Sequence, residues 1–184
     1  MRKNFFLIIF YLFVTVTSVF GKSSDKLLEE AEILRKKGFP DSATAIYRQI
    51  LESEPDNIQA ITDFAEEMLE IRNYAYALTL YRRYLELKPD DVQVRTLVID
   101  LYMSLELYDP GADECLNVLR KNPDDLIFLK KLKNIYQKAN LLKKEMAVTE
   151  KISSLEPDNE EIKKRLLELY IMQGRYDKSV ELVD

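Results

Sequence analysis

Apolar residues recur along the chain at the spacing of amphipathic helices. One clear stretch contains Ile58, Ile61, Phe64, Ala65 and Met68, which follow one another at intervals of one or three residues, with polar residues among them. Residues at this spacing share one face of an α-helix, so the pattern predicts a helix that buries that face. Similar stretches follow one another between residues 24 and 184, and we expect an all-α fold.

Four prolines divide these stretches at a constant interval of 34 residues: Pro55, Pro89, Pro123 and Pro157. Each is followed by Asp and then by Asn or Asp. Proline lacks a backbone N–H and closes a helix, and the Asp or Asn behind it can accept a hydrogen bond from the first free N–H groups of the next helix. A fixed period of this length predicts a repeat array.

A second break falls near the middle of most periods. It is marked by glycine, proline or asparagine beside an aromatic residue, at residues 38–41, 73–74, 108–110 and 174–176. Each period therefore predicts two helices of about three turns joined by a tight turn.

The unit resembles the tetratricopeptide repeat, a helix–turn–helix motif of this length. With the proline at repeat position 32, the units cover residues 24–57, 58–91, 92–125, 126–159 and 160–184. The family's small residues at positions 8 and 20 are matched by Ala31, Ala65, Ala43, Ala77 and Gly111. The resemblance implies a right-handed α-solenoid of about five units, the last incomplete, within a single domain over residues 22–184.

The fourth unit departs from the family pattern. Lys133 stands at position 8, Glu145 at position 20 and Thr149 at position 24. Polar residues at these helix contacts predict a looser helix pair, or one shifted in register.

Residues 1–21 have the pattern of a secretory signal peptide. Arg2 and Lys3 precede an apolar run from Phe5 to Phe20 that is shorter than a transmembrane helix. An uncleaved N-terminal anchor is the alternative. The expected location is the periplasm or cell envelope, or, for an anchor, the periplasmic face of the inner membrane.

The composition argues against catalysis. The chain has no histidine, its one cysteine (Cys115) falls on an inward helical position, and no glycine-rich phosphate loop exists. We expect no enzyme activity, no metal site and no cofactor. The formal net charge of −5 argues against nucleic acid as a partner.

In the family that the chain resembles, the first helix of each unit lines a concave groove that holds an extended peptide or a partner helix. Carried onto this chain, the resemblance implies a groove lined by Thr62, Glu66, Leu69, Thr96, Asp100, Met103, Lys130, Asn134, Gln137, Lys164 and Glu168.

The charge along this surface changes sign. Residues 24–119 hold 10 Lys and Arg against 20 Asp and Glu, whereas residues 120–165 hold 12 against 8. Such asymmetry orients a partner more than it adds affinity. Lys130 and Asn134 also match two positions of the carboxylate clamp of some family members, but Arg165 stands where the next unit should supply a second asparagine.

The leading hypothesis is a non-catalytic adaptor or scaffold of the cell envelope that binds a partner protein through this groove. One alternative is a self-associating structural module, or the N-terminal part of a larger assembly protein, that uses the open edge at Val180, Leu182 and Val183. The other is a secretion or assembly chaperone for extended clients. A membrane would be contacted only through an uncleaved N-terminal segment.

Overall fold

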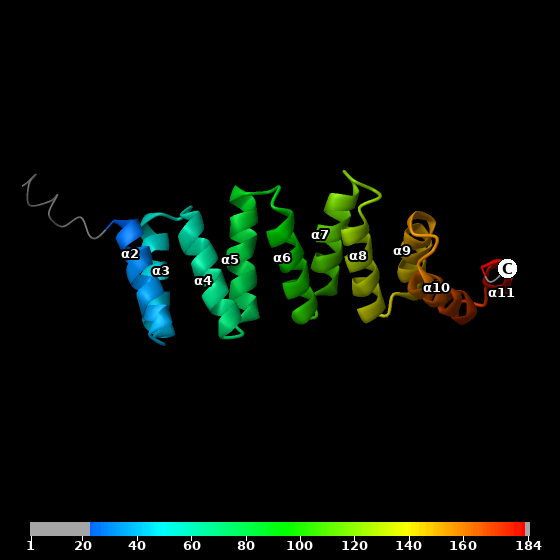
Figure 1. The fold of residues 1–184 in the computed structure, drawn as a ribbon, viewed down its shortest axis with the longest axis horizontal. Helices are drawn as coiled ribbons and strands as arrows, with labels where there is room; N and C mark the ends of the chain where they lie inside the picture. Colours follow the sequence, from blue (N-terminus) through cyan, green and yellow to red (C-terminus); the bar gives the residue numbers. More distant parts are fainter. Residues whose placement is uncertain (1–22, 183–184) are drawn as a thin grey trace, which may run out of the picture. The chain divides into compact units, whose positions relative to one another are not determined.

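A computed structural model describes residues 23–182 of the chain (Figure 1). The candidate signal segment and Val183 lie outside this range. Within it the structure consists of ten α-helices and contains no strand. None of the helices between residues 23 and 182 has the length and apolar character needed to cross a membrane.

The described residues form two compact units, one ending at Arg72 and the other beginning at Asn73. The boundary falls in the turn at the middle of the second repeat, where the sequence contains no linker. The domain prediction, a single repeat domain over residues 22–184, stays a prediction, and the two units are described separately.

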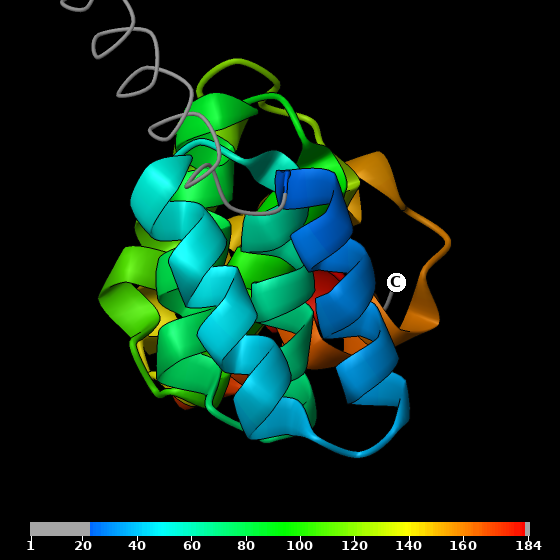
Figure 2. The same cartoon turned by 90° about the vertical axis from the view of Figure 1, so that its left-hand side faces the viewer.

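The first unit contains three helices: α2 (Ser24–Lys36), α3 (Pro40–Ser53) and α4 (Ile58–Glu70). Helix α3 packs on both α2 and α4. Figure 2 places α2 and α3 side by side in front. Tyr47 of α3 stacks on Phe64 of α4, with ring centroids 5.8 Å apart, and both side chains are buried. This aromatic pair joins the first repeat to the first helix of the second.

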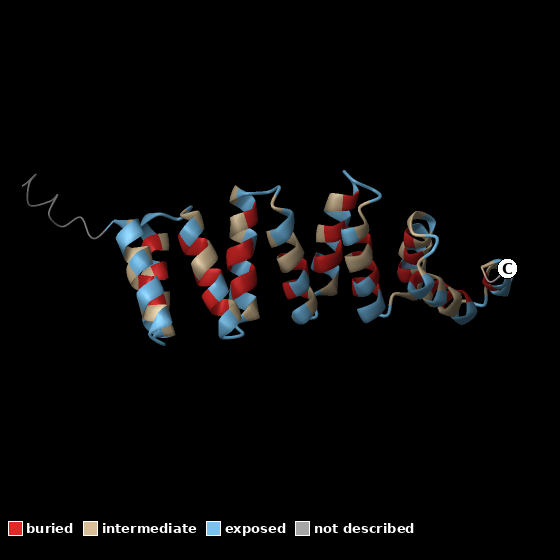
Figure 3. Ribbon diagram, viewed as in Figure 1, coloured by how far each residue is buried: buried red, intermediate tan, exposed pale blue. Residues whose placement is uncertain are grey.

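The second unit contains α5 (Tyr74–Leu87), α6 (Val92–Ser104), α7 (Tyr108–Leu119), α8 (Leu126–Lys138), α9 (Leu142–Leu155), α10 (Glu160–Met172) and α11 (Tyr176–Glu181). Each helix packs on the next. The buried residues lie on the faces between neighbouring helices (Figure 3). The centre of the core comes from α7 and α8, where Cys115, Phe128, Leu132 and Ile135 are buried together.

The local sequence explains where the first helix of each of repeats two to five begins. The side chains of Asn57, Asp91, Asp125 and Asn159 each accept a hydrogen bond from a backbone N–H two or three residues ahead. Each thereby satisfies one of the donors that a helix N-terminus leaves free. These residues follow the Pro-Asp steps directly, so the predicted capping role is confirmed.

The turns inside the repeats need a left-handed backbone conformation at one position. Positive φ angles occur at Gly38, Arg72, Glu106, Asn140 and Gly174, which are spaced 34 residues apart. Glycine adopts this conformation without steric cost, whereas a side chain opposes it. Of the three turns without glycine, those of Arg72 and Glu106 are therefore made by unfavourable residues, whereas the asparagine at position 140 tolerates this conformation better.

The prediction that the helices of the fourth repeat pair loosely or out of register is wrong. Helices α8 and α9 begin at Leu126 and Leu142, 34 residues after Val92 and Tyr108 begin α6 and α7. The two helices pack directly on each other although Lys133, Glu145 and Thr149 are all buried between or beside them. The helices still pair because the buried Glu145 carboxylate and Thr149 hydroxyl have hydrogen-bond partners.

Candidate functional site

Three of the predicted groove residues lie on α4, in the first unit. Glu66 is exposed and forms an ion pair with Arg35 of α2 at 3.6 Å. Leu69 is half-buried, and the Thr62 hydroxyl donates a hydrogen bond to the Ile58 carbonyl at 2.9 Å. This part of the predicted surface is polar, and Glu66 already has an ion-pair partner within the unit.

Helix α6 carries Thr96, Asp100 and Met103. The Asp100 carboxylate accepts a hydrogen bond from Lys131 of α8 at 2.5 Å, which links two successive first helices. Met103 is half-buried and packs against the core cluster. It is therefore partly a core residue, and less available as an apolar anchor than its repeat position predicts.

Lys130 and Asn134 do not form a shared site. The Lys130 ammonium donates to Glu156 Oε1 at 2.7 Å, and this contact holds the pKa of Glu156 below its usual value. The Asn134 side chain is exposed. The charge that a carboxylate clamp would need is thus already paired with a residue of the same repeat.

The remaining three predicted residues gather around one hollow. It lies between α8 and α10 and has a volume of about 250 Å³. Gln137, Lys164 and Glu168 line it together with Glu161 and Arg165, which stand at groove positions of the fifth repeat, and with Lys133, which was not assigned to the groove. We call it the α8–α10 hollow, and it is the candidate binding site.

Lys133 is the residue of this site that sequence reasoning missed. It is only 8 % exposed, and it occupies the repeat position where Ala31 and Ala65 stand in the first two repeats. The available signal was the charge itself. A lysine at a helix crossing was interpreted as a defect of packing and not as part of a site.

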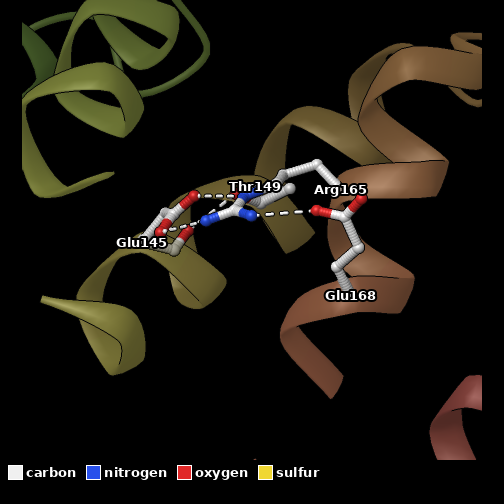
Figure 4. Close-up of polar contacts among 4 residues, drawn as sticks. All are labelled: Glu145, Thr149, Arg165 and Glu168. Carbon is white, nitrogen blue, oxygen red and sulfur yellow. Dashed lines mark hydrogen bonds and ion pairs between the residues drawn. The ribbon is translucent and has the colours of Figure 1, made fainter. Parts of the chain in front are cut away.

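Arg165, one of the residues that line the hollow, links α10 to α9 (Figure 4). Its Nε donates to Glu145 Oε1 at 2.7 Å and its Nη2 donates to Glu145 Oε2 at 3.0 Å, while Nη1 donates to Glu168 Oε2 at 2.9 Å. The hydrogen bonds to Glu145 raise the pKa of the guanidinium above its ordinary value, and those to Glu168 add to the effect. Thr149 donates its hydroxyl hydrogen to the Glu145 carbonyl at 2.8 Å. The buried Glu145 carboxylate and Thr149 hydroxyl of the fourth repeat are thereby satisfied.

The arrangement suits the binding of charged or polar groups. The side chains around the hollow are ammonium, guanidinium, amide and carboxylate groups, which hold charged or polar ligands. Cys115 lies in the core cluster, and burial raises the pKa of its thiol to about 12. Within residues 23–182 no cluster of three or more His, Cys, Asp or Glu side chains could hold a metal ion.

Comparison with known proteins identifies the fold. No model of a protein family matches the sequence, and no curated protein matches it. Solved structures do match. MamA is 16% identical with a TM-score of 0.62, over 87% of both chains. MamA from Desulfovibrio magneticus RS-1 is 15% identical with a TM-score of 0.58, over 89% of this chain and 92% of its own.

A tetratricopeptide repeat protein from Parabacteroides merdae ATCC 43184 matches 90% of this chain and 65% of its own, with a TM-score of 0.56 and 17% identity. At this level of identity the likeness concerns the fold. The chain thus has the all-α tetratricopeptide-repeat fold of successive helix pairs, as the sequence predicted.

Proposed function

We propose that this protein is a non-catalytic adaptor or scaffold that binds a partner protein on the first helices of its repeats. The observation that carries the proposal is the α8–α10 hollow, which is lined by Gln137, Lys164 and Glu168. The family resemblance assigns the same three residues to a partner-binding groove. The tetratricopeptide fold, used widely as a protein-interaction module, supports the same reading.

The site's chemistry is consistent with a polypeptide partner. The hollow is small, and its lining combines a lysine and an amide from α8 with two cationic and two carboxylate side chains from α10. Such a lining can pair with charged side chains of an extended segment or of a helix. Fold alone does not determine function, so the argument depends on these side chains.

In-cell crosslinking followed by affinity capture and mass spectrometry tests the proposal. The native chain is compared with a Gln137→Glu, Lys164→Glu variant. Both residues are exposed, so the helices should remain intact. The matched control is Lys143→Glu, which repeats the lysine-to-glutamate reversal of the variant at an exposed position of α9 outside the hollow. Circular dichroism verifies that all three chains are equally helical.

Loss of one or a few partners in the double variant, with capture retained by the control, supports the adaptor function. An unchanged set of captured proteins rejects this surface as the binding site. Capture of many unrelated proteins through the hollow would instead favour the chaperone function.

A second candidate function, self-association, is favoured by a different observation. Ile171 and Met172 at the end of α10, and Tyr176 and Val180 on α11, are all exposed apolar residues. Large exposed apolar patches often mark contact surfaces. Sedimentation of the native chain and of a Tyr176→Glu, Val180→Glu variant over a dilution series tests it. A native chain that is monomeric at every concentration rules this function out.

We also propose that the chain is exported to the cell envelope. Support comes from the basic start and the apolar run of residues 1–21. Cell fractionation with intact-mass measurement tests the proposal. Removal of about twenty residues indicates a cleaved signal, and a full-length envelope species indicates an anchor. A full-length chain in the cytoplasmic fraction contradicts export.

A further inference from the structure

We propose that the α8–α10 hollow receives an acidic side chain of the partner polypeptide, and that Lys133 binds its carboxylate. The inference rests on the proposed adaptor function and adds the chemical class that the site selects. It assigns a binding role to a residue at a repeat position that ordinarily serves helix packing.

The Lys133 side chain is largely buried, and its ammonium group has no partner in the described chain. Nine-tenths of its surface is covered, yet no hydrogen bond or ion pair joins its ammonium group to another residue of the described chain. By contrast, the neighbouring lysines of α8 are occupied, Lys130 by Glu156 and Lys131 by Asp100. Burying a charge is unfavourable unless an opposite charge or hydrogen bonds accompany it, so a carboxylate placed beside Lys133 would offset this cost.

The Lys133 ammonium is nevertheless open to a ligand. Among the described residues, the side-chain polar atom that is both fully enclosed and without a hydrogen-bond partner is Oε2 of Glu67, in the first unit. The unpartnered Nζ of Lys133 is not in that class and therefore meets solvent. Because Lys133 lines the α8–α10 hollow, the hollow is the route by which its ammonium can be reached.

Arg165 cannot compete for the incoming group. Its guanidinium is already bonded to the two oxygens of Glu145 and to Glu168. Lys164 is exposed and has no ion-pair partner in the described chain, and Gln137 offers an amide N–H beside it. The free donors of the hollow are thus Lys133 in its wall, with Lys164 and Gln137 near the surface.

The charge of the lining favours a singly charged ligand group. Three cationic side chains (Lys133, Lys164 and Arg165) and two carboxylates (Glu161 and Glu168) surround the hollow. Arg165 is already paired with Glu145 and Glu168, so the unpaired side chains of the lining are two cations, Lys133 and Lys164, and one carboxylate, Glu161. This excess of one positive charge suits one carboxylate, and the two glutamates of the lining repel a doubly charged phosphate more strongly than a single carboxylate. A volume of about 250 Å³ accommodates an Asp or Glu side chain.

Fluorescence anisotropy with a labelled octaglutamate peptide tests the inference on the full chain at low ionic strength, with octaglutamine as the uncharged reference peptide. Three variants remove one positive charge each while keeping the length of the side chain: Lys133→Met, Lys164→Met and Lys143→Met. We expect Lys133→Met to raise the Kd more than about tenfold and Lys164→Met to raise it less, because Lys164 is exposed. Lys143→Met, outside the hollow, should leave the Kd within about twofold.

Equal binding of octaglutamate by the native chain and by Lys133→Met overturns the inference, as does failure of the native chain to bind the peptide. Inorganic phosphate that binds in a Lys133-dependent way, while octaglutamate does not, overturns it in favour of a free-anion site. If Lys133→Met does not fold, the Kd values of Lys164→Met and Lys143→Met are compared, since both positions are exposed. Weaker binding by Lys164→Met supports the inference, and equal binding by the two variants overturns it. The adaptor function is judged separately by the crosslinking experiment, so protein capture without octaglutamate binding rejects only the acidic specificity.

Discussion

Arg165 of α10 and Glu145 of α9 form a two-pronged ion pair, with Nε 2.7 Å from Oε1 and Nη2 3.0 Å from Oε2. Glu145 is completely buried, and the Arg165 side chain is largely covered. The pair explains how a repeat with charged residues at its helix crossings keeps the regular period, because the buried carboxylate is matched at both oxygens. It also places the fourth repeat's unusual residues next to the candidate site.

Removing the arginine should strongly destabilise the second unit. Arg165→Met leaves the Glu145 carboxylate buried without its cation, and we expect a loss of about 3–5 kcal/mol in the free energy of unfolding. Urea unfolding followed by circular dichroism measures it. The double variant Glu145→Ala, Arg165→Met should recover most of the loss, since Ala43 and Ala77 occupy the equivalent position in other repeats. A double variant as unstable as Arg165→Met would contradict this account of the pair.

Lys133→Met should make the protein more stable. It replaces an unpaired ammonium on a largely covered side chain by an apolar group of similar length. Because the ammonium itself meets solvent, we expect a gain of only up to about 1 kcal/mol in the free energy of unfolding. The exposed control Lys143→Met should stay within about 0.5 kcal/mol of the native chain. The same urea series compares the three proteins. A less stable Lys133→Met would show that the lysine contributes to packing and is not held there at a cost.

Replacing Glu106 by glycine should also stabilise the protein. Glu106 has a φ of 57° in the turn between α6 and α7, where its side chain is disfavoured. We expect Glu106→Gly to gain up to about 1 kcal/mol, reduced by the greater backbone freedom of glycine in the unfolded chain. Asn140, at φ 55° in the next repeat, is the matched control, because Asn tolerates this conformation better. Thermal unfolding that ranks Asn140→Gly above Glu106→Gly would argue against a backbone cause.

Part of the acid sensitivity of the fold should come from Asp91. The backbone N–H of Val94 lowers the pKa of its carboxyl, and the Tyr84 hydroxyl contributes in the same direction. Since the folded pKa lies below the unfolded value of about 3.9, this contribution is complete above that pH and is lost as the pH falls through the folded pKa. Asp91→Asn keeps a cap that does not titrate, so its stability should fall less between neutral pH and about pH 3. If the free energy of unfolding falls equally with decreasing pH in both proteins, other carboxylates cause the acid sensitivity.

Cys115 should be inert in the folded protein. Its pKa of about 12 keeps the thiol protonated at ordinary pH, and its side chain is fully buried. The thiolate is the reactive form, so iodoacetamide should label the chain slowly under native conditions and rapidly in denaturant. Mass spectrometry of time points measures both rates. Rapid labelling of the native chain would show that the α7–α8 core opens readily.

The local signals of the sequence determined the helices. Pro-Asp steps, capping Asn and Asp residues and the apolar spacing act within a few residues of one another, so they could be interpreted without knowing the fold. The helices that begin at Ile58, Val92, Leu126 and Glu160 follow from them directly. The likeness to tetratricopeptide repeats was visible for the same reason, since a constant period needs no knowledge of tertiary contacts.

Only the tertiary structure decided which side chains are free. Lys130 and Asp100 have the right repeat positions for a groove, yet each is paired with a residue 26 or 31 positions away in sequence. Met103 is drawn partly into the core, and Lys133 is left alone in the wall of a hollow. These outcomes depend on how successive helices cross and which charges then come within hydrogen-bond reach. A repeat period specifies the position of a residue along a helix, but the partner across the helix interface is chosen by packing in three dimensions.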